Sequence, residues 1–427
     1  MIPITICDGK KELAVFEALN ARASEVDAAV TESVSKMIAD VRARGDDALR
    51  EYSLKFDKSD LEHFEVPHEE FKRAYEQCDA KLKSALHTAA DHIRKFHERQ
   101  KQQSFFANEE HGVMLGQKVR ALRRVGVYVP YGTAPLPSSV LMNVIPAKIA
   151  GVEEIIMATP PWEGKADPTI LAAAYLAGVD RVFMLGSAWA MAALAYGTET
   201  VPQVDKIVGP ANIYGATAKK LLYGTVGIDM IAGPSEILVI ADESANPAWL
   251  AADLLSQAEH DILAGVVLLT TSQDIAEQTA KELEAQLAKL PRREIATQAL
   301  QNNGAILVCE SMGQALAYSN KYAPEHLELC VTNPFELLGS IDNAGSVFMG
   351  HYTPESVGDY IAGPNHVLPT GGTPRFFSPL SVDDFVKKVQ FAYYTREALQ
   401  AARDDIVTIA EAEQLQAHAN AANIRFA

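Results

Sequence analysis

Gln257 and His260, near the middle of the chain, have side chains that can bind a divalent cation, and their spacing brings them together. Asn246 followed by Pro247 predicts a helix that begins there and runs towards Asp261, because Asn caps helices and Pro suits their first turn. Residues three apart share a helix face, so an amide oxygen and an imidazole would form half of a four-ligand site for an ion such as zinc. A solvated helix face is the alternative interpretation of the same pair.

A glutamate and a histidine stand side by side in the stretch YAPEHLEL, where Glu325 precedes His326, just after Pro324 and ahead of a strand-like run. Imidazole is the side chain best suited to proton transfer near neutral pH. Adjacent residues of a regular element point apart, so a pair that works on one substrate requires an irregular loop here. A purely structural Glu–His pair remains the alternative.

The segment 350–385 is rich in turns and contains Asp359, a possible carboxylate ligand, and His366, a possible polar contact. A loop of this length without its own secondary structure usually has a function. Ser235 lies in GPSE between two strand-like runs, but no GxSxG surrounds it, so we do not expect a nucleophile. No GxGxxG follows a strand, and LGSAWA at 185–190 is only a weak relative of that pattern. These residues alone predict a metal-assisted α/β enzyme with a histidine base.

The elements that must position these residues alternate between short apolar runs and Ala-rich helical stretches, which is typical of βαβ units with parallel sheets. The strand-like runs are VGVYV, EEIIMAT, RVFMLG, DMIAG, EILVIAD, GVVLLTT, AILVC and SVFMG. They fall into two groups on either side of Gly233, which predicts two α/β lobes. A cleft between the lobes should lie at the carboxyl ends of the strands, where open α/β sheets bind ligands.

The two ends of the chain read differently from this middle part. Residues 1 to about 25 have no strong pattern, and residues 26 to about 103 are helical in pattern. After Ser381, DDFVKK and then residues 395–423 read as helices with no strand between them. A helical tail this short cannot bury its apolar side alone, so it should pack on the body or on a second subunit.

Composition places the chain among ordinary globular proteins of more than one domain, with 427 residues, 48% hydrophobic and 22% charged. The net charge of −17 is spread along the chain and should repel nucleic acid and anionic membrane surfaces, so we expect neither partner. The four cysteines form no CxxC pair, and no apolar run approaches membrane length. We therefore expect reduced thiols and a cytoplasmic location.

Seven separated motifs in register resemble the histidinol dehydrogenase family over nearly the whole chain. They are YVPYGTAPLPSSVLMN at 128–143, YGTETVPQVDKIVGPAN at 196–212, DMIAGPSEILVIAD, ADLLSQAEHD, YAPEHLEL, GDYIAGPNHVLPTGGT and AEQLQAH. The resemblance implies a two-step oxidation of L-histidinol to L-histidine through an aldehyde, with two NAD molecules and one zinc ion per subunit.

The resemblance also implies roles for individual residues. His326 would be the general base, and Glu325 would activate the water that attacks the aldehyde. Zinc would orient the substrate rather than act as a redox centre, held by Gln257, His260 and Asp359 of one subunit and His418 of the other. The substrate would contact these ligands, His326, and also Ser235, His366 and Glu413. NAD would contact Tyr128 and Asn212.

Together the patterns and the resemblance predict two incomplete Rossmann-like lobes with parallel sheets plus small N- and C-terminal segments. Residues 1–25 would be the N-terminal segment. Residues 26–127 and 236–380 would form lobe 1, which binds zinc, and residues 128–235 would form lobe 2, which contacts the cofactor. Residues 381–427 would form a helical tail that reaches the partner of a homodimer with shared active sites.

Three positions depart from the family pattern in the cofactor motifs. Tyr131 replaces the first Gly of the usual YVPGG, Trp189 the Gln of GAQA, and Ala211 the second Gly of GPGN. The departures fit changed NAD contacts, a paralogue that oxidises another small alcohol such as a sulfonated diol, or a non-catalytic copy that only holds zinc and ligand. Glu413 favours the first, because a carboxylate attracts the ammonium group of histidinol and would repel an anionic substrate.

Glu413 and His418 are five residues apart, which on a continuous helix is about 140° beyond one full turn. Their side chains would diverge unless the helix bends or ends between them. The family usually has Gly there, whereas this chain has Gln414, so the bend must form without the freedom of glycine.

Overall fold

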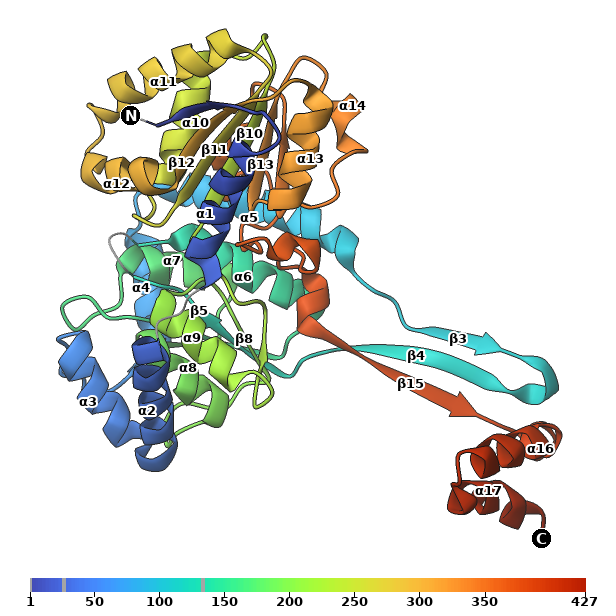
Figure 1. The fold of residues 1–427 in the computed structure, drawn as a ribbon. Helices are drawn as coiled ribbons and strands as arrows, with labels where there is room; N and C mark the ends of the chain where they lie inside the picture. The colour runs from blue at the N-terminus through green and yellow to red at the C-terminus, as the bar shows by residue number, and fades with distance from the viewer. Residues whose placement is uncertain (1, 25–27, 132–134) are drawn as a thin grey trace. The chain divides into compact units, whose positions relative to one another are not determined.

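The computed structural model describes residues 2–24, 28–131 and 135–427. The chain divides into two compact units: unit 1 comprises Met1–Gln100 and Leu122–Phe385, and unit 2 comprises Lys101–Ala121 and Val386–Ala427. Among the described residues, unit 1 contains two six-stranded sheets with their covering helices, and unit 2 contains a three-stranded sheet and a helical end (Figure 1). The predicted α/β class is confirmed.

The first sheet of unit 1 defines lobe 1 and is parallel throughout, in the order β1-β12-β11-β10-β13-β14. Its strands are β1 (Ile4–Ile6), β10 (Glu236–Ala241), β11 (Gly265–Thr270), β12 (Gly304–Val308), β13 (His326–Cys330) and β14 (Ser346–Met349). The central strands are apolar at nearly every position because helices bury both faces of the sheet.

Each face of the lobe 1 sheet has its own set of helices. One face packs against α10 (Pro247–Ala258), α11 (Gln273–Leu287) and α12 (Arg293–Asn303). The other packs against α1 (Lys11–Ser24) and α13 (Met312–Tyr322). Two shorter helices, α14 (Pro334–Leu338) and α15 (Glu355–Tyr360), follow β13 and β14.

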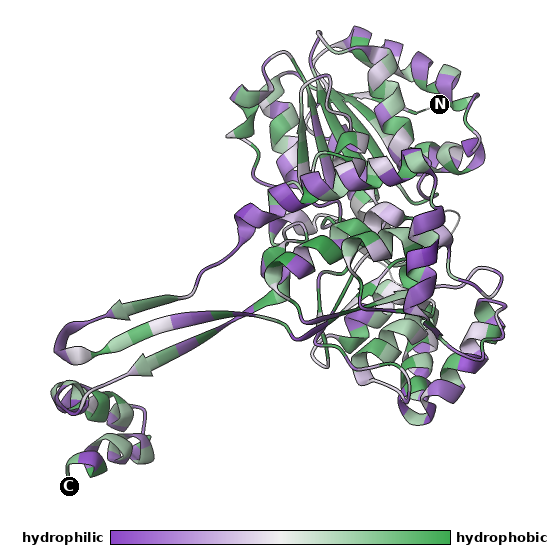
Figure 2. Ribbon diagram, turned by 180° about the vertical axis from the view of Figure 1, so that it is seen from behind, coloured by the Kyte–Doolittle hydropathy of each residue, from purple (hydrophilic) through white to green (hydrophobic). Residues whose placement is uncertain are grey.

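The second sheet defines lobe 2 and has the order β2-β7-β6-β5-β8-β9. Its strands are β2 (Glu65–Val66), β5 (Arg124–Tyr128), β6 (Glu154–Thr159), β7 (Arg181–Met184), β8 (Lys206–Val208) and β9 (Gly227–Ile228), of which β2 alone among them runs antiparallel. One face packs against α2 (Ala28–Arg44), α3 (Asp46–Phe56), α8 (Ser187–Tyr196) and α9 (Ile213–Leu222). The other packs against α4 (His68–Gln77), α5 (Ala80–His97), α6 (Pro137–Ala150) and α7 (Pro168–Ala177). In Figure 2 apolar residues, in green, follow the strands of both sheets, and the covering helices carry both green and purple residues.

The sequence assigned residues 26–127 to lobe 1, and this assignment is wrong for the helices and strands of that segment in unit 1. Strand β2 pairs with β7, and β5 pairs with β6 and β8, so both belong to the lobe 2 sheet. Helices α2 to α5 bury their apolar stripes on the same sheet. The N-terminal segment instead adds β1 to the lobe 1 sheet. A helical pattern shows which side of a helix is buried, but not which sheet buries it.

Unit 2 contains the antiparallel sheet β15-β4-β3, formed by β3 (Phe105–Asn108), β4 (Met114–Ala121) and β15 (Val386–Tyr393). The expectation of helix without strand after Ser381 is therefore wrong: Val382–Phe385 is one 3-10 turn in unit 1, and β15 follows it. Most β15 side chains are exposed on both faces, so the run has no alternating apolar pattern. Its pairing with β4 makes it a strand.

The end of unit 2 consists of α16 (Arg396–Ala412) and α17 (Gln416–Asn423), as the sequence predicted. Thr395 caps α16, and its hydroxyl accepts a hydrogen bond from the Ala398 amide at 3.1 Å. Between the helices Gln414 has a φ of +61°, in the left-handed region that favours glycine. The expected bend between Glu413 and His418 is present, and a non-glycine residue makes it at some conformational cost.

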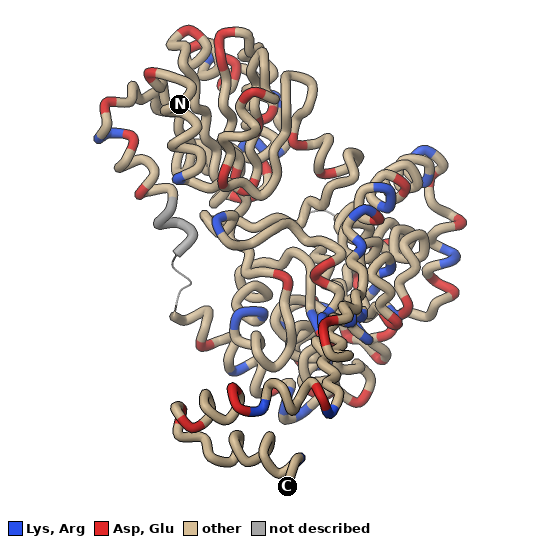
Figure 3. Tube along the Cα trace, turned by 90° about the vertical axis from the view of Figure 1, so that its right-hand side faces the viewer, with Lys and Arg blue, Asp and Glu red and all other residues tan. Residues whose placement is uncertain are grey.

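Charged residues of both signs are interspersed over the helices of unit 1 (Figure 3). Among the described residues, no helix is long and apolar enough to cross a membrane.

Candidate active site

A cavity of about 220 Å³ in unit 1 collects most of the residues that the sequence singled out. It is lined by Ser235, His260, Glu325, His326, Asp359 and His366, together with Glu355, Ser139, Lys219, Asp229 and the loop 209–211. On the lobe 2 side the cavity lies at the carboxyl ends of the strands, because the 209–211 loop directly follows β8. On the lobe 1 side it lies at the amino ends, because Ser235 and Glu325 directly precede β10 and β13. The prediction of carboxyl ends is therefore correct for lobe 2 and wrong for lobe 1.

His326 is the first residue of β13, and its orientation follows from one hydrogen bond. Its Nδ1 lies 3.0 Å from the carbonyl oxygen of Glu236. A carbonyl can only accept, so Nδ1 carries the ring proton and neutral His326 has a free lone pair on Nε2. That nitrogen lies 3.7 Å from Oε1 of Glu355. His326 can thus accept a proton at Nε2.

Glu325 lies in a bend before β13, as the irregular-loop argument required. Its Oε2 lies 3.7 Å from His326 Nδ1 and accepts a hydrogen bond from the Glu236 amide at 2.9 Å. Burial raises the pKa of Glu325 to about 7, against the smaller opposing effect of His326. A carboxyl group with such a pKa can either hold or accept a proton near neutral pH.

Helix α10 begins as predicted, with the Asn246 side chain accepting from the Ala248 amide at 2.9 Å and Pro247 in the first turn. It ends at Ala258, and a turn carries His260, whose amide donates to the Gln257 carbonyl at 3.2 Å. The Gln257 side chain is fully buried, and neither its oxygen nor its nitrogen has a hydrogen-bond partner among the described residues. A buried amide without a hydrogen-bond partner is uncommon, and a bound ion or a water molecule would satisfy it.

Donor atoms of His260, Glu355 and Asp359 lie within 4.8 Å of one another. Glu355 and Asp359 are four residues apart on α15, so they share one helix face. Burial, followed by the nearby Asp359 charge, raises the pKa of Glu355 well above its usual range. Glu355 was missed in the sequence, although its spacing from Asp359 in PESVGD was a usable signal.

His366 connects the two lobes in the cavity. Its Nδ1 lies 3.0 Å from the Asp359 carbonyl oxygen, so Nδ1 carries the proton, and its Nε2 lies 3.3 Å from the Ser139 hydroxyl of α6. Burial lowers the pKa of His366, which favours the neutral ring. The imidazole therefore offers a neutral polar contact rather than a positive charge.

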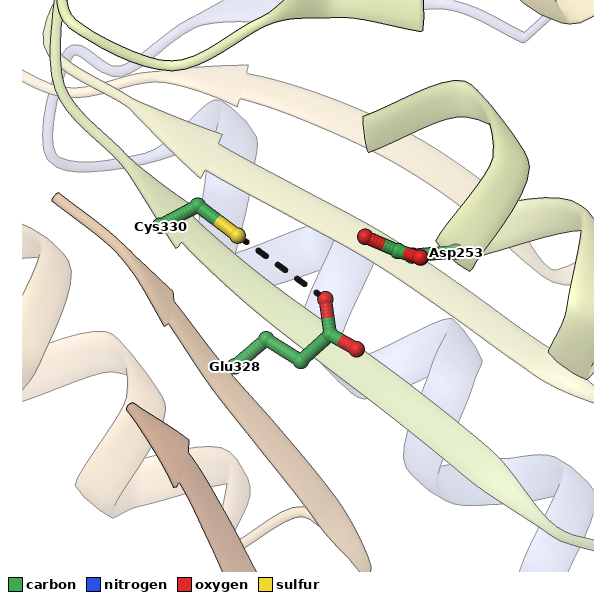
Figure 4. Close-up of side chains that lie close together, drawn as sticks. All are labelled: Asp253, Glu328 and Cys330. Carbon is green, nitrogen blue, oxygen red and sulfur yellow. Dashed lines mark hydrogen bonds between the residues drawn. The ribbon is translucent and has the colours of Figure 1, made fainter. Parts of the chain in front are cut away.

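A second group of acidic and thiol side chains, Asp253, Glu328 and Cys330, is connected to Glu355 (Figure 4). Asp253 extends from α10 towards Glu328 and Cys330 of β13. The Oε1 atom of Glu328 accepts a hydrogen bond from the Glu355 amide at 2.8 Å. Burial raises the pKa of Asp253 to about 6 and raises those of Glu328 and Cys330 further above their usual ranges. The group links α10, β13 and α15, and no sequence pattern indicated it.

The two predicted cofactor residues meet at the carboxyl edge of the lobe 2 sheet. The Tyr128 hydroxyl accepts from the Ser187 amide at 2.9 Å, and Asn212 caps α9, its Oδ1 accepting from the Gly215 amide at 3.0 Å. The Ser187 hydroxyl donates to the same Asn212 oxygen at 3.2 Å. Both residues are thus held beside the amino end of α8.

The three residues that depart from the family pattern lie at or next to this edge. Trp189 is almost fully buried and stacks on Phe56, with ring centroids 5.4 Å apart. The rings of Tyr131 and Trp162 pack together with their centroids 5.6 Å apart, and Ala211 lines the cavity. Part of the stretch after Tyr131, residues 132–134, lies outside the described residues.

A buried ion pair that the sequence did not reveal holds the 209–212 loop. Lys219 pairs with Asp229 and donates to the Gly209 carbonyl at 3.0 Å. Asp229 in turn accepts from the Gly209 amide at 2.8 Å. This pair fixes the loop that lines the cavity on the lobe 2 side.

Glu413 and His418 belong to unit 2, at the junction and start of α16 and α17, where both are exposed. The other predicted ligands and substrate contacts are in unit 1. The cavity of unit 1 brings together Ser235, His260, Glu325, His326, Asp359 and His366, whereas the buried Gln257 is not among the residues that line it.

Two parallel-sheet lobes with a cavity between them, lined by a Glu–His pair and a set of metal-binding donors, define a two-lobed α/β enzyme. The fold is shared with an acetylating aldehyde dehydrogenase from Geobacillus thermoglucosidasius, with a TM-score of 0.51 at 15% identity over 90% of this chain and 96% of that one. At this identity the likeness concerns the fold alone.

Closer relatives give the family. The family model described as histidinol dehydrogenase matches residues 20–426. The histidinol dehydrogenase of Geobacter sulfurreducens is 54% identical over 415 residues, 96% of this chain and 97% of that protein. A crystal structure of histidinol dehydrogenase from Elizabethkingia anophelis has a TM-score of 0.93 at 40% identity, covering 99% of this chain and 98% of that one. The chain belongs to the histidinol dehydrogenase family and is an oxidoreductase.

Proposed function

We propose that this enzyme oxidises L-histidinol to L-histidine through L-histidinaldehyde, with zinc and two molecules of NAD, as the last steps of histidine biosynthesis. Family membership supports the reaction type. The observation that carries the proposal is the free Nε2 of His326 in a cavity that also contains Glu325 and the donors His260 and Asp359.

Gln257, His260 and Asp359 would hold the zinc ion, with His418 of the partner subunit as the fourth ligand. The orphaned amide of Gln257 fits this role, because a metal ion would satisfy its buried oxygen. Two nitrogens and two oxygens suit zinc, and manganese or cobalt as well. When bound, the ion would orient the imidazole and amine of the substrate.

In the first oxidation, His326 Nε2 would accept the hydroxyl proton of the substrate, and NAD when bound would accept the hydride from the same carbon. The products are the aldehyde, NADH and a proton. The Glu236 carbonyl keeps the ring in the tautomer that this step needs.

In the second oxidation, ionised Glu325 accepts a proton from the water that attacks the aldehyde carbon. The hydrate anion formed in this way would lose its hydride to a second NAD and its hydroxyl proton to His326, which gives the carboxylate. The raised pKa of Glu325, about 7, suits a base that works near neutral pH. Ser235 and His366, which both line the cavity, would contact the substrate, and Tyr128 and Asn212 would contact NAD.

The active enzyme would be a homodimer in which the tail of one subunit supplies Glu413 and His418 to the other. In support, unit 2 exposes an unusual amount of apolar surface for its size. These side chains are Phe105, Phe106, Met114, Leu115, Val389, Tyr393, Tyr394, Ile406, Ile409, Leu415 and Ile424. Glu413 would meet the substrate ammonium group, which disfavours an anionic alcohol. The four unpaired cysteines agree with a cytoplasmic location.

The test is NADH production from L-histidinol, measured beside a panel of other alcohols that includes a sulfonated diol. We expect two NADH per L-histidine formed. His326→Ala should lower kcat by about 10²-fold to 10⁴-fold with unchanged zinc content. Preference for another alcohol would identify a paralogue, and zinc and substrate binding without any turnover would identify a non-catalytic copy.

A further inference from the structure

Glu236, the first residue of β10, has a buried carboxyl group that ties three parts of lobe 1 together. It is 1% exposed, and its Oε2 accepts a hydrogen bond from the Tyr322 hydroxyl at 2.8 Å. Its Oε1 accepts from the Gly371 amide at 3.0 Å. Both oxygens are acceptors, as in an ionised carboxylate. The side chain therefore fastens the start of β10 to the end of α13 and to the turn that contains Gly371.

The contact with Tyr322 lies at the start of the bend that carries Glu325. Tyr322 is the last residue of α13, and Glu325 follows three residues later. Between them Ala323 has a φ of +55°, an uncommon conformation for alanine, which persists only where the surrounding structure holds it. The hydrogen bond from Tyr322 to Glu236 holds the helix end from which this bend begins.

The contact with Gly371 holds a wall of the cavity. Gly371 has a φ of +60° and follows Thr370, which lines the cavity. The Thr370 hydroxyl in turn accepts a hydrogen bond from the Gly233 amide, three residues before Glu236. Two contacts thus hold this turn against the segment that leads into β10.

The backbone and the charge of Glu236 both act on the Glu325–His326 pair. Its carbonyl accepts from His326 and its amide donates to Glu325, so a movement of Glu236 would move both side chains. Burial is the main cause of the raised pKa of Glu325. The negative charges of Glu236 and Glu355 raise this pKa further, against the opposing effects of His326 and the Glu236 amide.

We propose that the side chain of Glu236 is a positioning residue of the active site, which fixes the strand end and the bend that orient His326 and Glu325. The inference rests on the proposed function, which assigns the proton transfers to that pair. Glu236 is not among the residues that line the cavity, so it acts through its neighbours. Its charge also favours the protonated form of Glu325, so that this group gains and loses its proton near neutral pH.

Two variants separate the charge from the contact, each in the zinc-loaded full-length protein. Glu236→Gln removes the charge and keeps both contacts, because its amide oxygen accepts from Gly371 and its amide nitrogen donates to the Tyr322 hydroxyl. Tyr322→Phe keeps the charge and removes one contact. Infrared difference spectra against Glu325→Gln follow the protonation of Glu325 with pH. Steady-state kinetics with histidinol and with histidinaldehyde follow the two oxidations.

The chain contains a matched pair of controls. Glu12 of α1 is fully buried, and its side chain also accepts from a tyrosine hydroxyl, that of Tyr318, and from a backbone amide, that of Asp8. Tyr318 lies one turn before Tyr322 on α13. Glu12→Gln and Tyr318→Phe therefore remove the same kinds of group without touching the Glu325–His326 pair.

In Glu236→Gln, Glu325 should lose its proton at a pH lower than in wild type by roughly half a unit or more, because a neighbouring negative charge is gone. The pH rise of aldehyde oxidation should move with it. Tyr322→Phe should lower kcat for both oxidations about tenfold with little change in KM, because misplaced groups slow the chemical step. Both controls should match wild type in titration and kcat, even where the Tm falls as much.

An unchanged titration of Glu325 in Glu236→Gln would overturn the inference, as would an equal loss of kcat in Tyr322→Phe and Tyr318→Phe. The infrared titration needs no substrate. If wild type forms no NADH from histidinol while Glu325 titrates as expected, the proposed function fails and the role of Glu236 in positioning that carboxyl group remains.

Discussion

At the scale of single residues, two backbone groups of Glu236 organise the Glu325–His326 pair. The Glu236 carbonyl accepts from His326 and the Glu236 amide donates to Glu325, so neighbouring strands β10 and β13 set both side chains. Backbone partners in a sheet are rigid, which gives the imidazole one tautomer and one orientation. If His326 is the base, as we propose, strand pairing decides which of its nitrogens accepts the proton.

The pH dependence of the aldehyde step should report Glu325. Its pKa is raised to about 7, so the ionised, active form should increase as the pH rises through that value. Glu325→Gln should lower the rate of histidinaldehyde oxidation by about 10²-fold or more and remove this rise, because an amide accepts no proton in this range. The measurement is the pH profile of NADH formation from the aldehyde. Exposed Glu336→Gln is the control, and an unchanged profile in Glu325→Gln would assign the water-activating role to another group.

At the scale of elements, Glu328 links the three pieces of chain that carry the proposed zinc ligands and the base. It lies on β13 two residues after His326, faces Asp253 of α10, and accepts from the first amide of α15. Asp253 is one helical turn before Gln257, and Glu355 is one turn before Asp359. A shift of any of these elements would change the distances between the ligands.

Glu328→Ala should therefore weaken both folding and metal binding. Leaving the Glu355 amide and Asp253 unsatisfied should cost roughly 2 to 4 kcal/mol of unfolding free energy. Zinc affinity should fall by roughly tenfold or more, as for other groups that orient ligands. Glu328→Gln keeps an acceptor for the amide and a donor for Asp253, and should retain most of both properties. Urea unfolding and chelator competition measure the two effects, and an unchanged zinc affinity in Glu328→Ala would show that other contacts position the ligands.

At the scale of the whole molecule, the cavity and the proposed fourth ligand belong to different compact units of the chain. The cavity is in unit 1, whereas Glu413 and His418 are in unit 2, a small unit with little core and much exposed apolar surface. A symmetric dimer can bury such a surface and complete two sites at once. This arrangement would make oligomerisation a condition of catalysis.

Mixing two inactive variants tests the shared site. His326→Ala and His418→Ala should each be nearly inactive as homodimers. If the tail acts on the partner, dimers reformed from an equal mixture should recover up to about one quarter of wild-type activity, because half are mixed and each mixed dimer has one intact site. Two His326→Ala preparations mixed in the same way are the control. Recovery of no activity from mixed dimers of verified composition would place His418 in the site of its own chain.

Local chemistry in the sequence determined much of this protein. Asn246 and Pro247 set the start of α10, and adjacent Glu325 and His326 required the bend that precedes β13. The roles that the resemblance implies for Glu413 and His418 require a break between α16 and α17, and Gln414 lies at that break. The apolar runs identified the central strands, although 229–233 lies beyond β9 and is irregular. These features depend on neighbours along the chain, so the sequence expresses them directly.

Tertiary structure alone decided how distant segments combine. It assigned α2 to α5 to lobe 2, made β15 a strand through its pairing with β4, and placed the lobe 1 part of the cavity at the amino ends of its strands. It also brought Glu355 to His326, Asp253 to Glu328, and Tyr322 to Glu236. Amphipathic patterns specify which side chains are buried but not against which partner, because any apolar surface of suitable shape satisfies them. Which of those partners a side chain packs against is therefore determined only by the tertiary structure.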